Sequence, residues 1–401
     1  MSPNKKSPPR ARGRSRRITL LEFTLVAAAF AGLLCCPRLW LSSHRLFPMT
    51  PVWQWLPQPP YPLDYILFGL ALASLAGVGI FFRRPVFFIK SFLALAAVLA
   101  LLDQSRWQPW LVGYAAMLGA LLLLPWDRPA EWDEQTTANV LHPCRLLMIC
   151  TYFYSGFQKL NYGFVVVLGL MLEPMFDRLH LNPAWLAPRT LGPAAMLLAL
   201  VECLSGAMLA FPRTRRLAVG CMILMHTTLL LWLGPLALRW NYVIWPWNLA
   251  MIALLVILFT GKARWDLRTL WRSHTYAKVI GVAFGILPLL TLFGAWDAYL
   301  GFSLYSGNIK DAMVYVDPKR AAELPAEVRP YVKPDGMMEI DRWSNQELGV
   351  PIYPETRIFA SVGRQVANWL GPHATVRVIE IDKPNRFTGE RKATQFDPLT
   401  Y

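Results

Sequence analysis

Lys159 ends an apolar stretch of the chain, in the run YFYSGFQKLN that covers residues 152–161. A cation at the edge of the membrane hydrocarbon is costly, so a lysine there is by default a functional hypothesis. An amine at such an apolar boundary can lose its proton and act as a general base. The alternative is an interfacial anchor, in which the aliphatic stem stays in lipid and the ammonium reaches the headgroups. From the residues alone, both interpretations stay open.

Arg145, Glu202 and His226 are further ionisable side chains that fall inside apolar segments. Polar groups at bilayer depth pair with one another, with backbone, or with a water-lined cavity. Pairing of Glu202 with His226 or with Arg145 would give a buried polar network beside Lys159. For His226, the alternative is a hydrogen bond that only holds helices together.

The motifs of soluble enzymes are absent from the sequence. It has no GxSxG, no Walker loop, no HExxH and no paired CxxC, and its histidines show no ligand spacing. The six cysteines all fall within apolar segments, where they behave as small hydrophobic residues. We therefore expect no metal site and no disulfide.

These residues need helices to position them, and the composition supplies a reason to expect such helices. Of the 401 residues, 55% are hydrophobic and only 16% are charged, which indicates a polytopic membrane protein. Apolar runs of membrane-spanning length predict nine transmembrane helices. They cover approximately 18–36, 65–82, 86–102, 110–126, 140–160, 193–211, 217–236, 241–260 and 278–296.

The net charge of +15 is distributed by membrane side. With nine spans, 19 Lys and Arg residues lie on the N-terminal side and 6 in the loops of the other side. The positive-inside rule then places the N-terminus in the cytoplasm and the C-terminus outside. The basic excess reflects topology, so we expect no nucleic-acid partner.

The pattern divides the chain into three parts. Residues 1–17 form a basic cytoplasmic arm, residues 18–296 form the transmembrane domain, and residues 297–401 form a small extracytoplasmic α+β domain. In the last part, 313–316 and 375–381 predict strands, 355–370 predicts an amphipathic helix, and 385–389 predicts a turn. Between the fifth and sixth spans, the apolar segment 164–172 predicts a re-entrant or interfacial piece.

Several dispersed motifs together resemble those of one known family. They are Arg145, Tyr152-Phe153, Gly156 and Lys159-Leu160, then Glu202-Cys203-Leu204-Ser205-Gly206, the basic residues at 213–216, Gly220, His226, Trp245-Pro246-Trp247, Leu304-Tyr305-Ser306-Gly307 and Asp311-Ala312-Met313-Val314. This set is similar to the vitamin K-dependent γ-glutamyl carboxylases and the related HTTM (horizontally transferred transmembrane) domain. The resemblance covers roughly residues 18–316.

The resemblance implies a membrane enzyme that uses a quinone or another lipid-soluble substrate. In the carboxylases, the lysine that matches Lys159 deprotonates vitamin K hydroquinone. Glu202 and His226 are then further catalytic candidates, and Arg145, Tyr152 and Gly156 are candidates for contact with the quinone-like cofactor. A compact chain of this kind indicates a bacterial inner membrane protein, with membrane lipid and a lipid-soluble small molecule as partners, and a protein partner remains open.

A second function stays open beside the first. Trp110 stands near the position where the family has a histidine, which favours a non-catalytic membrane scaffold or binding partner of the same fold. The presence of Lys159 favours the enzyme.

Overall fold

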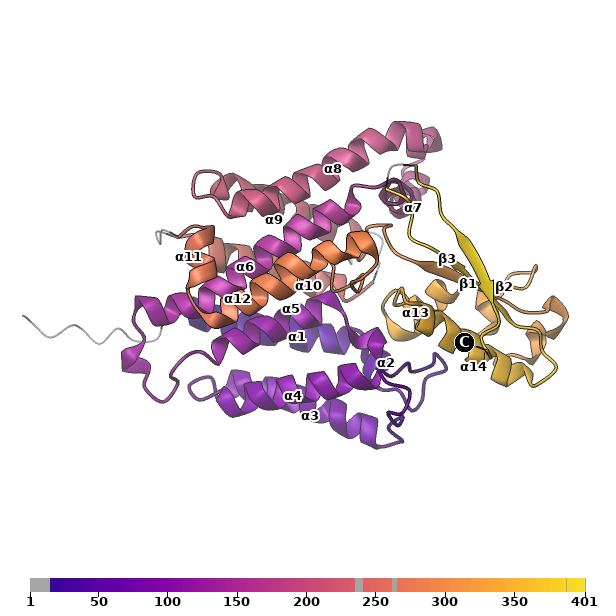
Figure 1. Ribbon diagram of the computed structural model, residues 1–401, viewed down its shortest axis with the longest axis horizontal. Coiled ribbons are helices and arrows are strands. Elements are labelled where there is room, and N and C mark those ends of the chain that lie inside the picture. Colours follow the sequence, from indigo (N-terminus) through magenta and orange to yellow (C-terminus); the bar gives the residue numbers. More distant parts are fainter. Residues whose placement is uncertain (1–14, 235–240, 262–264, 387, 401) are drawn as a thin grey trace, which may run out of the picture.

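The computed structural model describes residues 15–234, 241–261, 265–386 and 388–400. Most of the basic arm expected at 1–17 lies outside these residues. Each of the nine apolar runs corresponds to a helical segment (Figure 1). These are α1 (Arg16–Cys35), α3 (Leu63–Ile80), α4 (Val86–Leu102), α5 (Pro109–Leu121), α6 (Glu134–Lys159), α8 (Pro188–Leu209), α9 (Arg215–Leu233), α10 (Ile244–Phe259) and α12 (Thr275–Gly281) continued by η4 (Val282–Ile286) and η5 (Leu287–Phe293).

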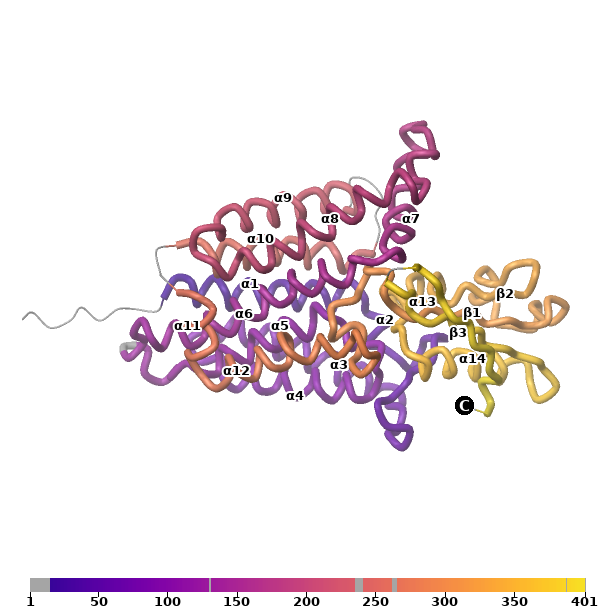
Figure 2. Tube along the Cα trace, turned by 45° about the horizontal axis from the view of Figure 1, so that its top comes forward, coloured from indigo at the N-terminus to yellow at the C-terminus, as the bar shows by residue number. Residues whose placement is uncertain are grey.

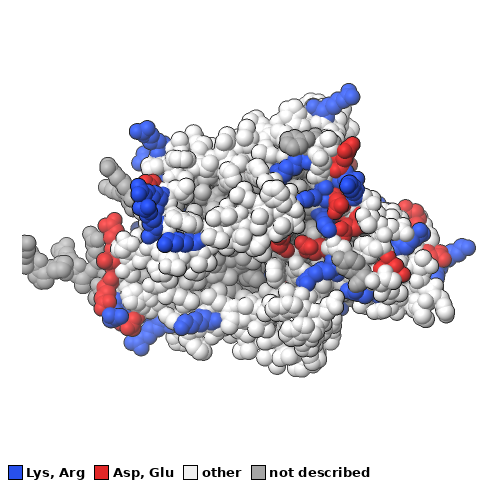
Figure 3. Space-filling view, viewed as in Figure 1, with Lys and Arg blue, Asp and Glu red and all other residues white. Residues whose placement is uncertain are grey.

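The helices identify an integral membrane protein. Among the described residues, five are long and apolar enough to cross a bilayer, and α6 with α7 (Tyr162–Arg178) makes a sixth if the bent pair counts as one span. The helices α4, α5 and α10 are apolar but have only 10–17 residues. Lys and Arg gather toward the two ends of the molecule, and a broad band of other residues lies between them (Figure 3).

Short helices connect these segments: α2 (Pro37–Trp40), η1 (Gln104–Arg106), η2 (Pro129–Glu131), η3 (Pro183–Leu186) and α11 (Leu267–Arg272). The helix α7 turns away from α6 by 94° and projects from the bundle (Figure 2). The side chain of Asn161 accepts a hydrogen bond from the Phe164 N–H at 3.2 Å, which caps the first turn of α7. The apolar segment 164–172 therefore belongs to a separate helix, α7, which is bent away from α6.

Close contact between α6 and α8 sets the relative position of the candidate residues. A Cβ at Gly156 of α6 would lie 2.2 Å from the backbone nitrogen of Cys203, and one at Gly206 of α8 would lie 2.3 Å from that of Phe153. Glycines at both crossing points let the two backbones touch, as small residues do in membrane bundles. This packing brings Glu202 of α8 beside the last turns of α6.

An α+β domain caps one end of the bundle (Figure 1). Its antiparallel sheet has the order β2-β1-β3-β4, with β1 (Asp311–Tyr315), β2 (Met337–Met338), β3 (Arg377–Ile381) and β4 (Ala393–Phe396). Helices α13 (Ile340–Leu348) and α14 (Thr356–Leu370) and the short η6 (Pro318–Glu323) and η7 (Arg329–Tyr331) complete the domain. The sequence predicted strands at 313–316 and 375–381 and a helix at 355–370. All three are confirmed, and each end agrees with the structure to within two residues.

Candidate functional site

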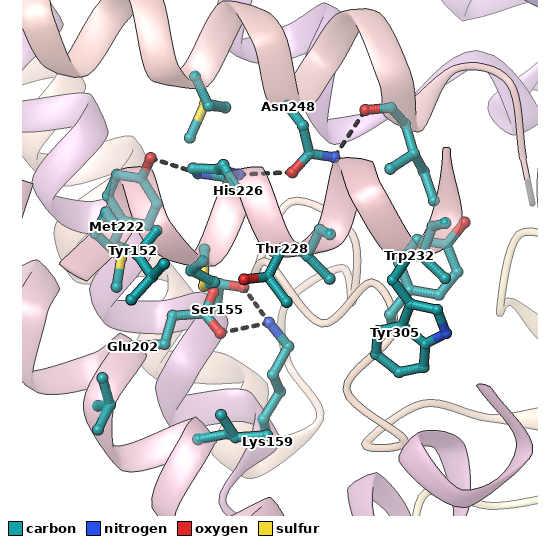
Figure 4. Close-up of a pocket in the computed structure, with 18 of the residues that line it drawn as sticks. Tyr152, Ser155, Lys159, Glu202, Met222, His226, Thr228, Trp232, Asn248 and Tyr305 are labelled. Carbon is teal, nitrogen blue, oxygen red and sulfur yellow. Dashed lines mark hydrogen bonds and ion pairs between the residues drawn. The ribbon is translucent and has the colours of Figure 1, made fainter. Parts of the chain in front are cut away.

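A cavity of about 460 Å³ lies between α6, α7, α8, α9 and α10 (Figure 4). Most of its wall is apolar and aromatic, and a few polar groups converge at the α6 side. The residues that line it are Thr151, Tyr152, Ser155, Lys159, Phe164, Leu168, Met171, Leu198, Val201, Glu202, Cys221, Met222, Leu224, Met225, His226, Thr228, Leu229, Trp232, Leu233, Ile244, Trp247, Asn248, Met251, Leu304 and Tyr305. A largely apolar pocket with few convergent polar groups is the usual form of a small-molecule site.

Lys159 and Glu202 form an ion pair at the polar side of this cavity. The distance from Lys159 Nζ to Glu202 Oε2 is 2.6 Å, and the Lys159 and Glu202 side chains are only 16% and 8% exposed. The ammonium also donates to Ser155 Oγ, one turn earlier on α6, at 2.9 Å. The expected buried partner of Glu202 is thus found, but it is Lys159, not His226 or Arg145.

A second polar group is a chain of three side chains from three helices. Tyr152 Oη lies 2.7 Å from His226 Nε2, and His226 Nδ1 lies 2.6 Å from Asn248 Oδ1. The amide nitrogen of Asn248 donates to the Ile244 carbonyl, so its oxygen is the atom that faces the imidazole. His226 therefore donates from Nδ1 and, when neutral, accepts from the Tyr152 hydroxyl at Nε2.

Part of the cavity wall is exposed. Three lining residues, Leu198 and Val201 of α8 and Leu224 of α9, are 54%, 40% and 68% exposed. Both helices are long and apolar enough to cross a membrane. The exposed part of the wall therefore belongs to two apolar helices of membrane-spanning length.

Arg145 lies elsewhere and does not line the cavity. Its Nε donates to the Leu258 carbonyl at 2.8 Å, and its guanidinium lies 4.9 Å from the centre of the Trp265 ring. The expectation that Arg145 belongs to the same polar cluster is corrected, because Arg145 precedes Lys159 by about four turns of the same helix, roughly 20 Å. Gly156 also does not line the cavity, because α8 fills the space beside it.

Two polar residues of the site were not expected from the sequence. Asn248 fixes the orientation of His226, and Ser155 is a second partner of Lys159. Ser155 stands four residues before Lys159, a spacing that places both side chains on one face of a helix. Asn248 follows Trp245-Pro246-Trp247 directly, but nothing in the sequence pairs it with His226.

The arrangement combines one buried ion pair with a chain of neutral hydrogen-bonding groups at the wall of a largely apolar cavity. Lys159 and Glu202 together carry no net charge, and the Tyr152–His226–Asn248 chain offers neutral hydrogen-bonding groups. Within the described part of the chain, no group of three His, Cys, Asp or Glu side chains could hold a metal ion.

Comparison with known protein families, with characterised proteins and with solved structures gives no match.

Proposed function

We propose that this chain is a membrane enzyme of the HTTM and carboxylase-like type, acting on a quinol or a similar lipid-soluble ring compound with Lys159 as the base. The observation that carries the proposal is the Lys159–Glu202 pair, buried at the polar side of a largely apolar cavity. An interfacial anchor would place its ammonium among headgroups, whereas this ammonium is bonded to two side chains inside the bundle.

The cavity suits a neutral headgroup better than an anionic one. The charges of Lys159 and Glu202 cancel, so a phosphate or carboxylate headgroup would meet Glu202 without a free cation to balance it. Aromatic side chains, among them Trp232, Trp247 and Tyr305, supply flat surfaces for a ring. A quinol supplies a weakly acidic hydroxyl and can pass on electrons once it is deprotonated.

The pair can take a proton without creating an isolated buried charge. Lys159 accepts the proton of a bound hydroxyl while its own proton passes to Glu202. After the step, the ammonium remains beside the new oxygen anion and Glu202 is neutral, so the total charge of the site is unchanged. Such transfer is general base catalysis by two side chains acting together.

The proposed topology has nine spans, with the N-terminus in the cytoplasm and the C-terminus outside, in a bacterial inner membrane. The charge distribution supports it, together with the nine apolar helical segments. Short spans such as α5, with 13 residues, then require local thinning of the bilayer or flanking side chains that reach the headgroups.

The test measures binding and ionisation separately. The purified protein in lipid nanodiscs is titrated under anaerobic conditions with a short-chain naphthohydroquinone, and the absorbance of the bound compound reports its anion. The wild type should bind the compound and raise its anionic fraction. Lys159→Arg, which keeps the charge beside Glu202 but stays protonated, should bind it without ionising it.

Lys90→Arg is the matched control, since Lys90 lies exposed on α4, away from the cavity. It should behave as the wild type. Binding without ionisation by the wild type would favour the non-catalytic scaffold, and absence of binding would reject the ring-compound site.

A further inference from the structure

A second, much smaller space adjoins the cavity on the far side of Thr151. This side chamber, of about 20 Å³, lies between α5, α6 and α10. Thr151, Trp247 and Met251 line both the cavity and the side chamber, so one layer of side chains separates the two.

Two residues that line the side chamber, Trp110 and Tyr114, are only 2% and 3% exposed. The indole nitrogen of Trp110 and the hydroxyl of Tyr114 are buried, and neither has a hydrogen-bond partner among the described residues. The two residues are four apart on α5, so their side chains lie on one face of that helix. A buried donor left without a partner costs free energy, and native proteins satisfy nearly all such groups.

The orientation of Trp110 agrees with a donor aimed at this space. The Cζ3 edge of its six-membered ring packs against Gly32 of α1, where a Cβ would lie only 2.8 Å away. The N–H lies on the other side of the indole, so it faces away from α1. The hydroxyl of Thr151 donates to the Leu147 carbonyl at 2.9 Å, which leaves its oxygen free to accept.

We propose that the side chamber binds one water molecule, held by Trp110, Tyr114 and Thr151. A water needs roughly 10–15 Å³ of such space and two to four polar partners, and this chamber offers both. The water accepts from the indole N–H and from the Tyr114 hydroxyl, and donates to Thr151 Oγ1. It thereby links α5, which contributes no side chain to the cavity, to the cavity wall.

The direction in which Tyr114→Phe changes the melting temperature tests the proposal. If the chamber is dry, Tyr114→Phe removes an unpaired hydroxyl and the melting temperature rises. If the water is bound, the same substitution removes one of its partners and the melting temperature falls. Tyr154→Phe is the calibrating variant, because the Tyr154 hydroxyl donates directly to the Gly285 carbonyl, and its melting temperature should fall.

Combining two substitutions tests whether Thr151 and Tyr114 bind the same water molecule. Thr151→Val and Tyr114→Phe should have less effect together than the sum of their separate effects, since either one loosens the same water. A density map that resolves ordered waters should also show a peak between the three side chains. A rise or no change on Tyr114→Phe, strictly additive effects, or an empty chamber in such a map would each overturn the proposal.

Discussion

Arg386 of the α+β domain bonds to Gln158, the residue directly before Lys159. Its Nη2 donates to Gln158 Oε1 at 2.5 Å, and its Nη1 donates to the Phe157 carbonyl at 3.0 Å. Gln158 is fully buried and also bonds to Thr291 and Asn308. The loop between β3 and β4 therefore holds the end of α6 at the point where the candidate base stands.

Loss of this contact should loosen the end of α6. Arg386→Met keeps much of the side-chain volume but leaves Gln158 Oε1 and a helix-end carbonyl with fewer donors, which predicts a loss of about 1–3 kcal/mol in the free energy of unfolding. Hydrogen exchange should quicken at residues 155–160 specifically. Arg364→Met, at a side chain of α14 in the same domain, is the comparison, and equal exchange in both variants would contradict the prediction.

The α6–α8 contact predicts opposite effects of two glycine substitutions. Gly156→Ala places a methyl 2.2 Å from a backbone atom of α8, so the helices must separate, and we expect a loss of several kcal/mol together with weaker ligand binding. Gly220→Ala, on α9, meets nothing within 4 Å and should raise stability slightly, because alanine favours the helix. Thermal unfolding of both proteins in the same detergent measures the difference. Similar melting temperatures would show that α6 and α8 are not in backbone contact.

One exposed stripe of α7 should cross from lipid to water. Val166 and Leu170 are 46% and 60% exposed, and Glu173 and Asp177 continue the same stripe with charged side chains. With cysteine at each position in turn, a membrane-impermeant maleimide added to spheroplasts should label 173 and 177 but not 166 and 170. Labelling of 173 and 177 only after the membrane is opened would instead place this end of the bundle in the cytoplasm and reverse the proposed topology.

The α+β domain should lose stability as the pH rises from about 4.5 to 7. Burial, aided by the nearby Asp297, raises the pKa of Glu355 from 4.5 to about 7. Within that window the folded protein holds the proton more firmly than the unfolded chain does, so the free energy of unfolding falls with rising pH. Glu355→Gln, which stays neutral, should be the more stable protein at pH 8 and should flatten the profile.

Denaturant unfolding of the wild type and the variant across this pH range provides the measurement. Glu327→Gln, at an exposed side chain, should keep the wild-type profile. A Glu355→Gln profile parallel to that of the wild type would refute this origin of the pH dependence.

The sequence predicts the helices better than it predicts their partners. Apolar runs locate the helical segments because each must present a nonpolar surface, and Pro125 explains why the fourth ends near Leu121 instead of at 126. In the α+β domain, β2 has two residues and β4 is mostly exposed, so neither shows the alternation that identifies a buried strand. The position of these short edge strands depends on the strands they pair with, β1 and β3.

The partner of Glu202 in the site is another feature that the sequence alone does not predict. The sequence suggested His226 or Arg145 as the partner of Glu202, whereas the structure pairs it with Lys159. That pairing depends on the register of α6 against α8, which the two glycines determine only in three dimensions. Arg145 could have been excluded earlier, because its position along α6 separates it from Lys159 by more than half the thickness of a bilayer.

The Lys159–Glu202 pair also bears on how the protein is made. Taken alone, α6 is not among the helices apolar enough to cross a membrane, and it carries two cations. Its counter-charge lies 43 residues later in the chain, so α6 is synthesised before Glu202. Without α8, Lys159 would stand at the edge of the hydrocarbon without its partner, which is costly. We therefore expect α6 and α8 to enter the lipid together.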